Sequence, residues 1–160
     1  EYLPARRLQA FEGIAAPGHL EAAALQLVVG PMSDRWGRRP VILTGIATPE
    51  QAAEAAAAVD AVLVLTSSSG FTTPAAQVAL VEALAATGTP VVHASLRNPY
   101  DVVHVGEVTA SLAAYGNADA SLRALAGVLA GEVKARGKLP VTIPTADGTG
   151  EAFPLGHGLG

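Results

Sequence analysis

Short apolar runs recur along the chain at regular intervals from about residue 41 onward. Residues 41–43, 61–65 and 90–94 are largely apolar or β-branched and are bounded by Gly, Pro or polar residues. Such runs predict strands covered on both faces, because a strand with one face in water would show alternating polar positions. We expect a shorter strand at residues 109–114 and a last strand at residues 139–143.

Helix signals separate these strands. Thr48 can cap a helix that has Pro49 in its first turn, and Gln51 completes a capping box with Thr48. An Ala-rich helix should follow. We predict a second helix over residues 73–87, ending at a glycine, and a third over residues 121–131.

The alternation of strand and helix recurs at roughly 20–28 residues, the length of a βαβ unit. We therefore predict an α/β fold, a three-layer α/β/α sandwich with a mainly parallel sheet, over residues 19–160. Residues 1–18 show no clear period and end in Ala-Pro-Gly, which indicates a linker or a strap on a larger surface. Residues 19–28 predict a short helix running into a strand, and residues 31–40 a polar loop.

Composition restricts the classes of function. The chain has 160 residues, 50% of them hydrophobic and 15% charged, which predicts one folded domain rather than a disordered segment. A net charge of −4 without a long basic run predicts no nucleic-acid partner. The absence of Cys excludes a disulfide scaffold and thiolate metal sites. No run approaches the ~18 apolar residues of a membrane span.

No secretory signal is recognisable at the start of the chain, which begins with Glu. We interpret the chain as a piece processed or excised from a longer protein. Signals for localisation can therefore lie elsewhere, and the sequence leaves the compartment open.

Ligands of an open parallel sheet bind beyond the carboxyl ends of its strands. The loops at residues 45–48, 66–73, 96–101 and 115–119 qualify. None carries a recognisable catalytic motif: the serines at 67–69 lack the glycines of a nucleophile elbow, and the chain has no phosphate-binding loop. The glycines near the end of the chain mimic a dinucleotide fingerprint but have no helix after them.

The titratable residues form no convincing catalytic or metal-binding set. The four His residues stand at positions 19, 93, 104 and 157, without metal-ligand spacing. His93 falls within an apolar strand and is best interpreted as a hydrogen-bonded core residue. We therefore predict no catalytic residue, no metal site and no cofactor within these residues.

The loop at residues 97–101 is the most informative. It joins a fixed charge, an amide, a rigid proline and an aromatic ring at the end of a strand, and such a loop can contact a polar partner or ligand. Ordinary turn chemistry explains the same residues equally well. Because residues 115–117 follow the next strand, we expect the two loops to lie side by side.

At this loop the sequence resembles the second, α/β sandwich domain of glycoside hydrolase family 3, most closely its β-N-acetylglucosaminidase (β-hexosaminidase) branch. The most specific likeness is Gly-Lys-Leu-Pro-Val-Thr-Ile-Pro followed by Gly-His-Gly-Leu near the end of the chain. The resemblance covers about two thirds of the chain. The stretches that carry it are residues 61–65, 88–101, 112–116, 137–144 and 154–159.

The resemblance implies a division of labour. Full-length members resemble retaining hydrolases whose (β/α)₈ barrel carries the aspartate nucleophile and, in this branch, a His–Asp acid/base pair. A barrel needs about 250 residues, so these 160 residues do not include it. His93, Ser95, Gly106 and Asn117 depart from the family pattern. The candidates for the substrate cleft or the barrel interface are Arg97, Asn98, Pro99, Tyr100, Asp101, Tyr115, Gly116 and Asn117.

We therefore expect an accessory C-terminal domain that supports the barrel of a retaining β-N-acetylglucosaminidase and forms one wall of its substrate cleft. Its partners would be the barrel of the same polypeptide and a carbohydrate substrate. Isolated, it should be inactive, and it should self-associate or cover its exposed apolar interface with residues 1–18. The alternative is a free-standing doubly wound binding module. The sequence does not distinguish hydrolase from phosphorylase, nor one glycoside from another.

Overall fold

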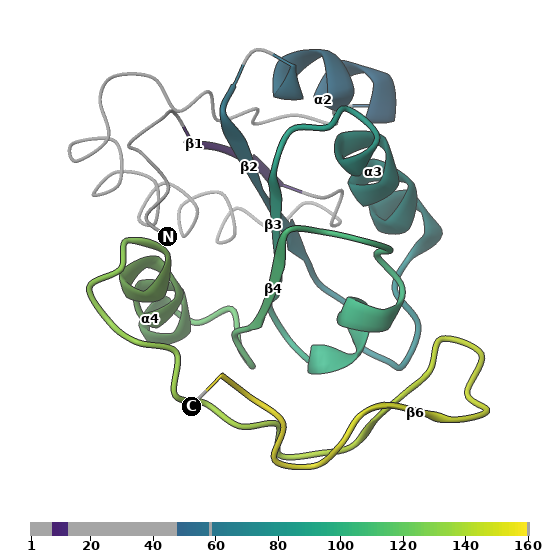
Figure 1. The fold of residues 1–160 in the computed structure, drawn as a ribbon, viewed down its shortest axis with the longest axis vertical. Coiled ribbons are helices and arrows are strands. Elements are labelled where there is room, and N and C mark those ends of the chain that lie inside the picture. The colour runs from purple at the N-terminus through teal and green to yellow at the C-terminus, as the bar shows by residue number, and fades with distance from the viewer. Residues whose placement is uncertain (1–7, 13–47, 58, 160) are drawn as a thin grey trace.

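The computed structural model describes residues 8–12, 48–57 and 59–159. Strands and helices alternate through most of this part of the chain, and a short hairpin follows them (Figure 1). The elements are β1 (Leu8–Glu12), α2 (Pro49–Ala56), β2 (Ala61–Thr66), α3 (Ala75–Ala85), β3 (Val91–Ser95), the 3₁₀ helix η1 (Pro99–Val103), β4 (Ala110–Ala113), α4 (Asp119–Leu129), β5 (Ile143–Pro144) and β6 (Glu151–Phe153).

The main sheet has four strands in the order β1-β2-β3-β4, and every neighbouring pair is parallel. Parallel neighbours need crossover connections, which the helices supply here. Val64 of β2 pairs with His93 of β3, and His93 pairs in turn with Ser111 of β4. The predicted parallel sheet is thereby confirmed.

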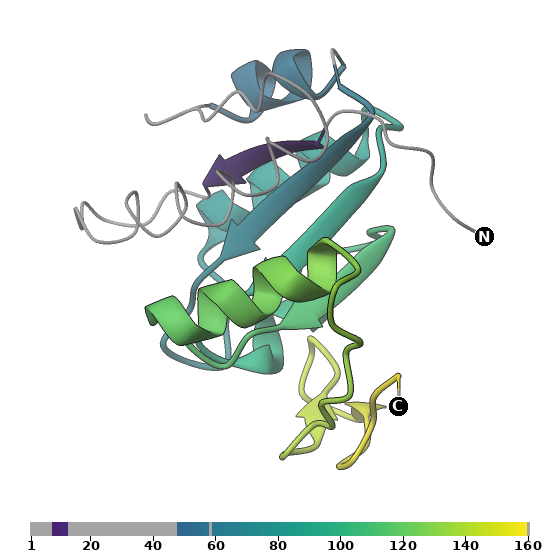
Figure 2. The same ribbon diagram turned by 90° about the vertical axis from the view of Figure 1, so that its left-hand side faces the viewer.

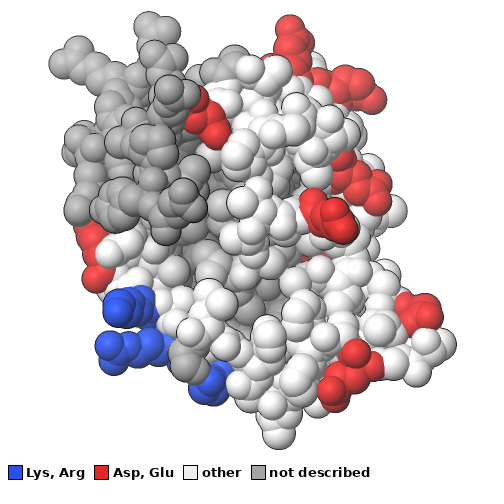
Figure 3. Space-filling view, viewed as in Figure 1, with Lys and Arg blue, Asp and Glu red and all other residues white. Residues whose placement is uncertain are grey.

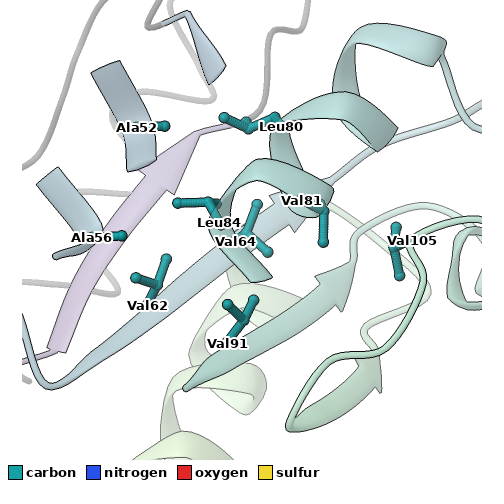
Figure 4. Packing of buried hydrophobic residues seen from close by; sticks show 9 residues of the cluster. All are labelled: Ala52, Ala56, Val62, Val64, Leu80, Val81, Leu84, Val91 and Val105. Atoms are coloured by element: carbon teal, nitrogen blue, oxygen red, sulfur yellow. The ribbon is translucent and has the colours of Figure 1, made fainter. Parts of the chain in front are cut away.

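Alternate residues of the central strands enter two different cores. Val62 and Val64 pack with α2 and α3 on one face of the sheet (Figure 4). Leu63 and Leu65 pack against α4 on the other face (Figure 2). This two-sided burial explains why β2 is apolar throughout. It also confirms the predicted three-layer α/β/α sandwich.

The first described helix, α2, begins as the sequence predicts. Thr48 Oγ1 accepts from Gln51 N at 3.4 Å, and Thr48 N donates to Gln51 Oε1 at 3.0 Å. The capping box is therefore complete, with Pro49 in the first turn. Two of the otherwise unpaired amides at this helix end are satisfied within the helix itself.

Replacing Thr48 with Ala should lower the free energy of unfolding by about 1 kcal/mol, because the cap at the exposed start of α2 is lost. Urea denaturation of the 160-residue chain measures this directly. The control is Glu54→Ala, an exposed position in the same helix, which should change stability by no more than about 0.5 kcal/mol. Equal stability of the Thr48→Ala and Glu54→Ala chains would contradict the assignment.

The other two predicted helices are confirmed within two residues at each end. α3 spans Ala75–Ala85 and α4 spans Asp119–Leu129. Thr73 does not cap α3, because its hydroxyl is engaged elsewhere, and Pro74 occupies the cap position without a side-chain bond. Leu122 and Leu125 form the buried stripe of α4.

The prediction for residues 1–18 is wrong at residues 8–12. Leu8–Glu12 forms β1, which pairs with β2 in the sheet, whereas the sequence predicted only a linker or strap there. The segment was missed because β1 lacks the continuous apolar run of β2 and joins polar to apolar residues in only five positions. The expected elements at residues 19–28, 31–40 and 41–43 lie outside the described residues.

The predicted last strand at residues 139–143 is wrong. Only Ile143–Pro144 is a strand, and it pairs antiparallel with Glu151–Phe153 in a separate two-stranded sheet. Pro140 lacks the backbone N–H that a strand inside the main sheet would have to donate. The Gly-rich end of the chain supplies the second strand of this hairpin.

Candidate functional site: the loops at the carboxyl edge of the sheet

Three loops leave the same edge of the sheet. They follow β2, β3 and β4, which are parallel neighbours, and we call them the carboxyl-edge loops: residues 67–74, 96–104 and 114–118. The loops at residues 97–101 and 115–117 therefore leave neighbouring strands at one edge, as the sequence predicted. This is the edge at which open parallel sheets bind ligands.

A fully buried carboxylate joins the first two loops. Asp101, in η1, has no solvent exposure. Its Oδ1 accepts hydrogen bonds from Ser68 Oγ at 2.5 Å and from Thr73 Oγ1 at 2.8 Å, and its Oδ2 accepts from Thr66 Oγ1 at 2.6 Å. Three hydroxyl donors thus replace the water that a buried carboxylate gives up. The result is a fixed connection between η1 and the end of β2.

His93 extends this network into the middle of the sheet. Its Nε2 lies 2.7 Å from Thr66 Oγ1, and its Nδ1 lies 2.7 Å from Ser111 Oγ. Because Thr66 uses its single hydroxyl hydrogen on Asp101, Nε2 must donate to Thr66. Nδ1 of the neutral ring then accepts from Ser111. The network therefore assigns His93 the tautomer with its hydrogen on Nε2.

The protonation state of His93 agrees with this tautomer. Burial lowers its pKa from the ordinary value of 6.5 to about 4, although the charge of Asp101 opposes part of the shift. The neutral ring is then the form present near neutral pH. The interpretation of His93 as a hydrogen-bonded core residue is confirmed.

Asn98 connects the second carboxyl-edge loop to the first by hydrogen bonds. Its side-chain Nδ2 donates to Ser68 O at 2.8 Å and to Gly70 O at 3.1 Å. Its Oδ1 accepts from Tyr100 N at 3.1 Å and so caps η1. The amide is therefore occupied inside the protein, and Pro99 beside it is buried.

The residues that face solvent differ from those that build the loops. Arg97 and Asn117 are exposed, and Tyr100 is half-buried against Phe71, with ring centroids 4.6 Å apart. Phe71 is itself 69% exposed, and His104 Nε2 lies 2.8 Å from its carbonyl oxygen. An exposed aromatic side chain is thus held on a hydrogen-bonded loop.

Tyr115 and Gly116 form a tight exit from β4. Tyr115 has φ of 55°, in the left-handed region, which costs a residue with a Cβ about 1–2 kcal/mol. Its ring is 43% exposed. A Cβ on Gly116 would lie 2.8 Å from Ser121 Oγ, so a larger residue there would displace the start of α4 or that hydroxyl.

The sequence did not predict how these side chains combine. It singled out Asn98 and Asp101 but not their partners Thr66, Ser68 and Thr73. These partners lie 28–35 residues from Asp101 along the chain, so no local pattern signals the contact. Phe71 was missed as well, although an aromatic residue in a Ser/Gly/Thr-rich loop at a strand end was a usable signal.

The described arrangement stabilises loops rather than performing acid/base chemistry. Asp101 is enclosed by hydroxyl groups and cannot reach a substrate from that position. Among the described residues no group of three or more His, Asp or Glu side chains could hold a metal ion. In the same part of the chain, no helix is both long and apolar enough to cross a membrane.

Comparison with known proteins identifies the family of the chain and solved structures with a similar fold. Residues 9–160 match the family described as "Glycosyl hydrolase family 3 C-terminal domain". No curated protein matches the chain. The solved structures similar to it include two whose chains are far longer than this one.

The first is a fungal multi-domain GH3 β-N-acetylglucosaminidase with an N-acetyltransferase region. Its TM-score is 0.68 at 17% identity, over 96% of this chain and 17% of that chain, a likeness that concerns the fold alone. The second is a glycoside hydrolase family 3 β-N-acetylglucosaminidase from Paenibacillus sp. str. FPU-7. Its TM-score is 0.54 at 26% identity, over 79% of this chain and 24% of that chain.

Proposed function

Because the chain belongs to the glycosyl hydrolase family 3 C-terminal domains, we propose that it is the accessory domain of a retaining β-N-acetylglucosaminidase. The family match over residues 9–160 carries the proposal. The substrate class comes from the similar Paenibacillus enzyme, whose chain this one covers to 24%. The comparisons give no support to the alternative of a free-standing binding module.

In this proposal the (β/α)₈ barrel of the same polypeptide performs the chemistry. Retaining cleavage requires two carboxyl-type groups, or a carboxylate and a paired His, held about 5–9 Å apart across the glycosidic bond. Asp101 is the only acidic residue of the second carboxyl-edge loop. Its carboxylate is fully buried and accepts hydrogen bonds from three hydroxyl groups. We therefore assign the nucleophile and the acid/base group to the barrel.

The carboxyl-edge loops then form the wall that faces the barrel and its substrate cleft. Arg97, Tyr115 and Asn117 are exposed there and are the proposed contacts. Asn98, Pro99 and Asp101 contribute by shaping the loop behind those contacts. Their buried bonds preorganise the wall, so that little flexibility is lost when a partner binds.

The isolated 160-residue chain should not hydrolyse a chromogenic β-N-acetylglucosaminide at a measurable rate. The full-length enzyme, assayed beside it, should hydrolyse the substrate, because removing the catalytic carboxyl groups typically costs several orders of magnitude in rate. The same assay repeated with phosphate distinguishes hydrolysis from phosphorolysis.

Turnover by the isolated chain within about a hundredfold of the intact enzyme would contradict this assignment. Substitutions would then locate the misplaced machinery. Loss of that turnover in Glu107→Gln, an exposed acidic residue that follows η1, but not in Glu54→Gln, would place catalysis in this domain. Glu54 is the control because it is exposed on α2, remote from the carboxyl-edge loops.

A further inference from the structure

The last part of the described chain forms a projecting arm. We call residues 137–159 the C-terminal arm; it includes the β5–β6 hairpin and runs beneath the sandwich, away from α2 and α3 (Figures 1 and 2). Ile143 is its only buried residue, and the others are exposed or half-buried. The arm therefore buries little of its own surface within this domain.

The arm is nevertheless rigidly built at its base. Leu139 N donates to His157 O, and Gly156 N donates to Leu139 O, both at 2.8 Å. The Phe153 and His157 rings lie 5.1 Å apart. A Cβ on Gly158 would lie only 2.4 Å from the carbonyl oxygen of Gly137, so the close approach of the two ends of the arm requires glycine at position 158.

The tip of the arm is equally ordered. Asp147 accepts hydrogen bonds from the hydroxyl groups of Thr145 at 2.5 Å and Thr149 at 2.8 Å. These bonds lower its pKa to about 2. Gly150 N also donates to Thr145 Oγ1 at 3.0 Å. A segment that is hydrogen-bonded at both ends yet exposed along its length is preorganised to contact another body.

Large apolar side chains stand on this arm and on the surface next to it. Leu155 is 66% exposed and Leu159 is 88% exposed. The arm packs on the body where β5 contacts η1, and the Tyr100 ring of η1 lies tilted against the exposed Phe71 ring. The arm is therefore in contact with the second carboxyl-edge loop, whose Tyr100 reaches the first loop. Exposed apolar groups on the arm and on a loop near its contact with the body are candidates for an interaction site.

The charge of the arm narrows the class of partner. Lys138, Asp147 and Glu151 are its only charged residues. In Figure 3 the lower rim, where Figure 1 places the arm, is uncharged along its middle, with Lys and Arg side chains at its left end and acidic side chains toward the right. Few charges and exposed Leu and Phe side chains are the composition of the core of a protein–protein interface. Anionic ligands and nucleic acids would need positive charge along the uncharged part of the arm.

We propose that the C-terminal arm and Phe71 form the docking surface for the catalytic barrel of the same polypeptide, with Leu155 and Leu159 buried against it. The proposal rests on the proposed function, which supplies the barrel. Its occupant follows from chain length: this chain covers 17% and 24% of the similar enzymes, so most of each of those chains lies outside this domain. Docking would bury the apolar surface that the isolated domain exposes.

The test uses the full-length polypeptide with the double substitution Leu155→Ser and Leu159→Ser. Undocking should raise the rate of tryptic cleavage between barrel and C-terminal domain at least tenfold and split one thermal transition into two. The control is Val133→Ser, a side chain that is 56% exposed but lies outside the arm. It should behave as the wild type does.

The isolated 160-residue chain checks that the substitutions act on docking and not on folding. Both Leu side chains are exposed in it, so the double variant should melt within about 2 °C of the wild-type chain. If the variant chain melts earlier than that, Phe71→Ser in the full-length polypeptide becomes the deciding variant, with the same tenfold expectation.

A full-length double variant that resists trypsin as Val133→Ser does would overturn the proposal. So would a full-length polypeptide that dimerises and becomes monomeric in the double variant, since that result assigns the surface to a second copy although the barrel is available. Chromogenic turnover of the full-length enzyme is read separately. If the full-length wild type is inactive but the double variant is cleaved faster, the proposed activity is wrong and the docking surface stands. If the wild type is active but the double variant is cleaved at the wild-type rate, the activity stands and the docking surface is wrong.

Discussion

Replacing Asp101 with Ala should lower the free energy of unfolding of the 160-residue chain by about 3–5 kcal/mol. The carboxylate is fully buried and accepts hydrogen bonds from Thr66, Ser68 and Thr73. Its removal leaves these hydroxyl groups without their acceptor, and each unsatisfied buried donor costs about 1–3 kcal/mol. Part of that cost is recovered because Ser68 can turn toward Asn98 Oδ1. Urea denaturation gives the value.

Asp147 provides a matched control for this substitution. It also accepts hydrogen bonds from two threonine hydroxyl groups, but it lies exposed at the tip of the C-terminal arm. Water can replace the carboxylate there, so Asp147→Ala should cost far less stability than Asp101→Ala. Similar losses for the two variants would show that burial of the network is not what makes Asp101 important.

Acid should destabilise the chain through His93. The pKa of this ring is about 4 in the folded protein and 6.5 when unfolded, because burial disfavours the charged form. Between these values the unfolded state binds more protons, so stability falls as the pH falls from about 6.5 to 4. The contribution of His93 is complete above pH 6.5. A shift of this size is worth about 3 kcal/mol across that window.

The measurement is urea denaturation at several pH values, with His93→Gln as the comparison. The variant cannot titrate at this position, so the stability difference between wild type and variant should shrink as the pH falls through this window. Subtracting the two profiles removes the contribution of titrating groups that do not interact with His93. Parallel profiles, or an NMR titration of the His93 ring with a midpoint near 6.5, would contradict the buried neutral state.

Much of the architecture followed from local patterns. Continuous apolar runs predicted β2 and β3, because a strand covered on both faces has mostly apolar residues along its whole length. Thr48 and Gln51 predicted the start of α2, since the capping box involves only neighbours in sequence. β1 and the hairpin of the C-terminal arm were missed, because their pairing with distant residues, rather than their own sequence, makes them strands.

The candidate site was predictable only in outline. The sequence located the loops at residues 97–101 and 115–117, because parallel strands end at a common edge. It could not separate the residues that shape a loop from those that face outward. Asn98 and Asp101 resemble ordinary turn residues, and only their contacts with residues 28–35 positions away show them to be buried anchors.

By itself the sequence determined the α/β layering, the helix starts and the family resemblance, since all three are written in short-range patterns of apolar, capping and motif residues. Only the tertiary structure decided that His93, Thr66 and Asp101 share one hydrogen-bond network and that the C-terminal arm leaves most of its residues exposed. The physical reason is the same in both cases. Hydrogen bonds and burial depend on which residues meet in space, and a parallel sheet brings together side chains that the chain keeps far apart.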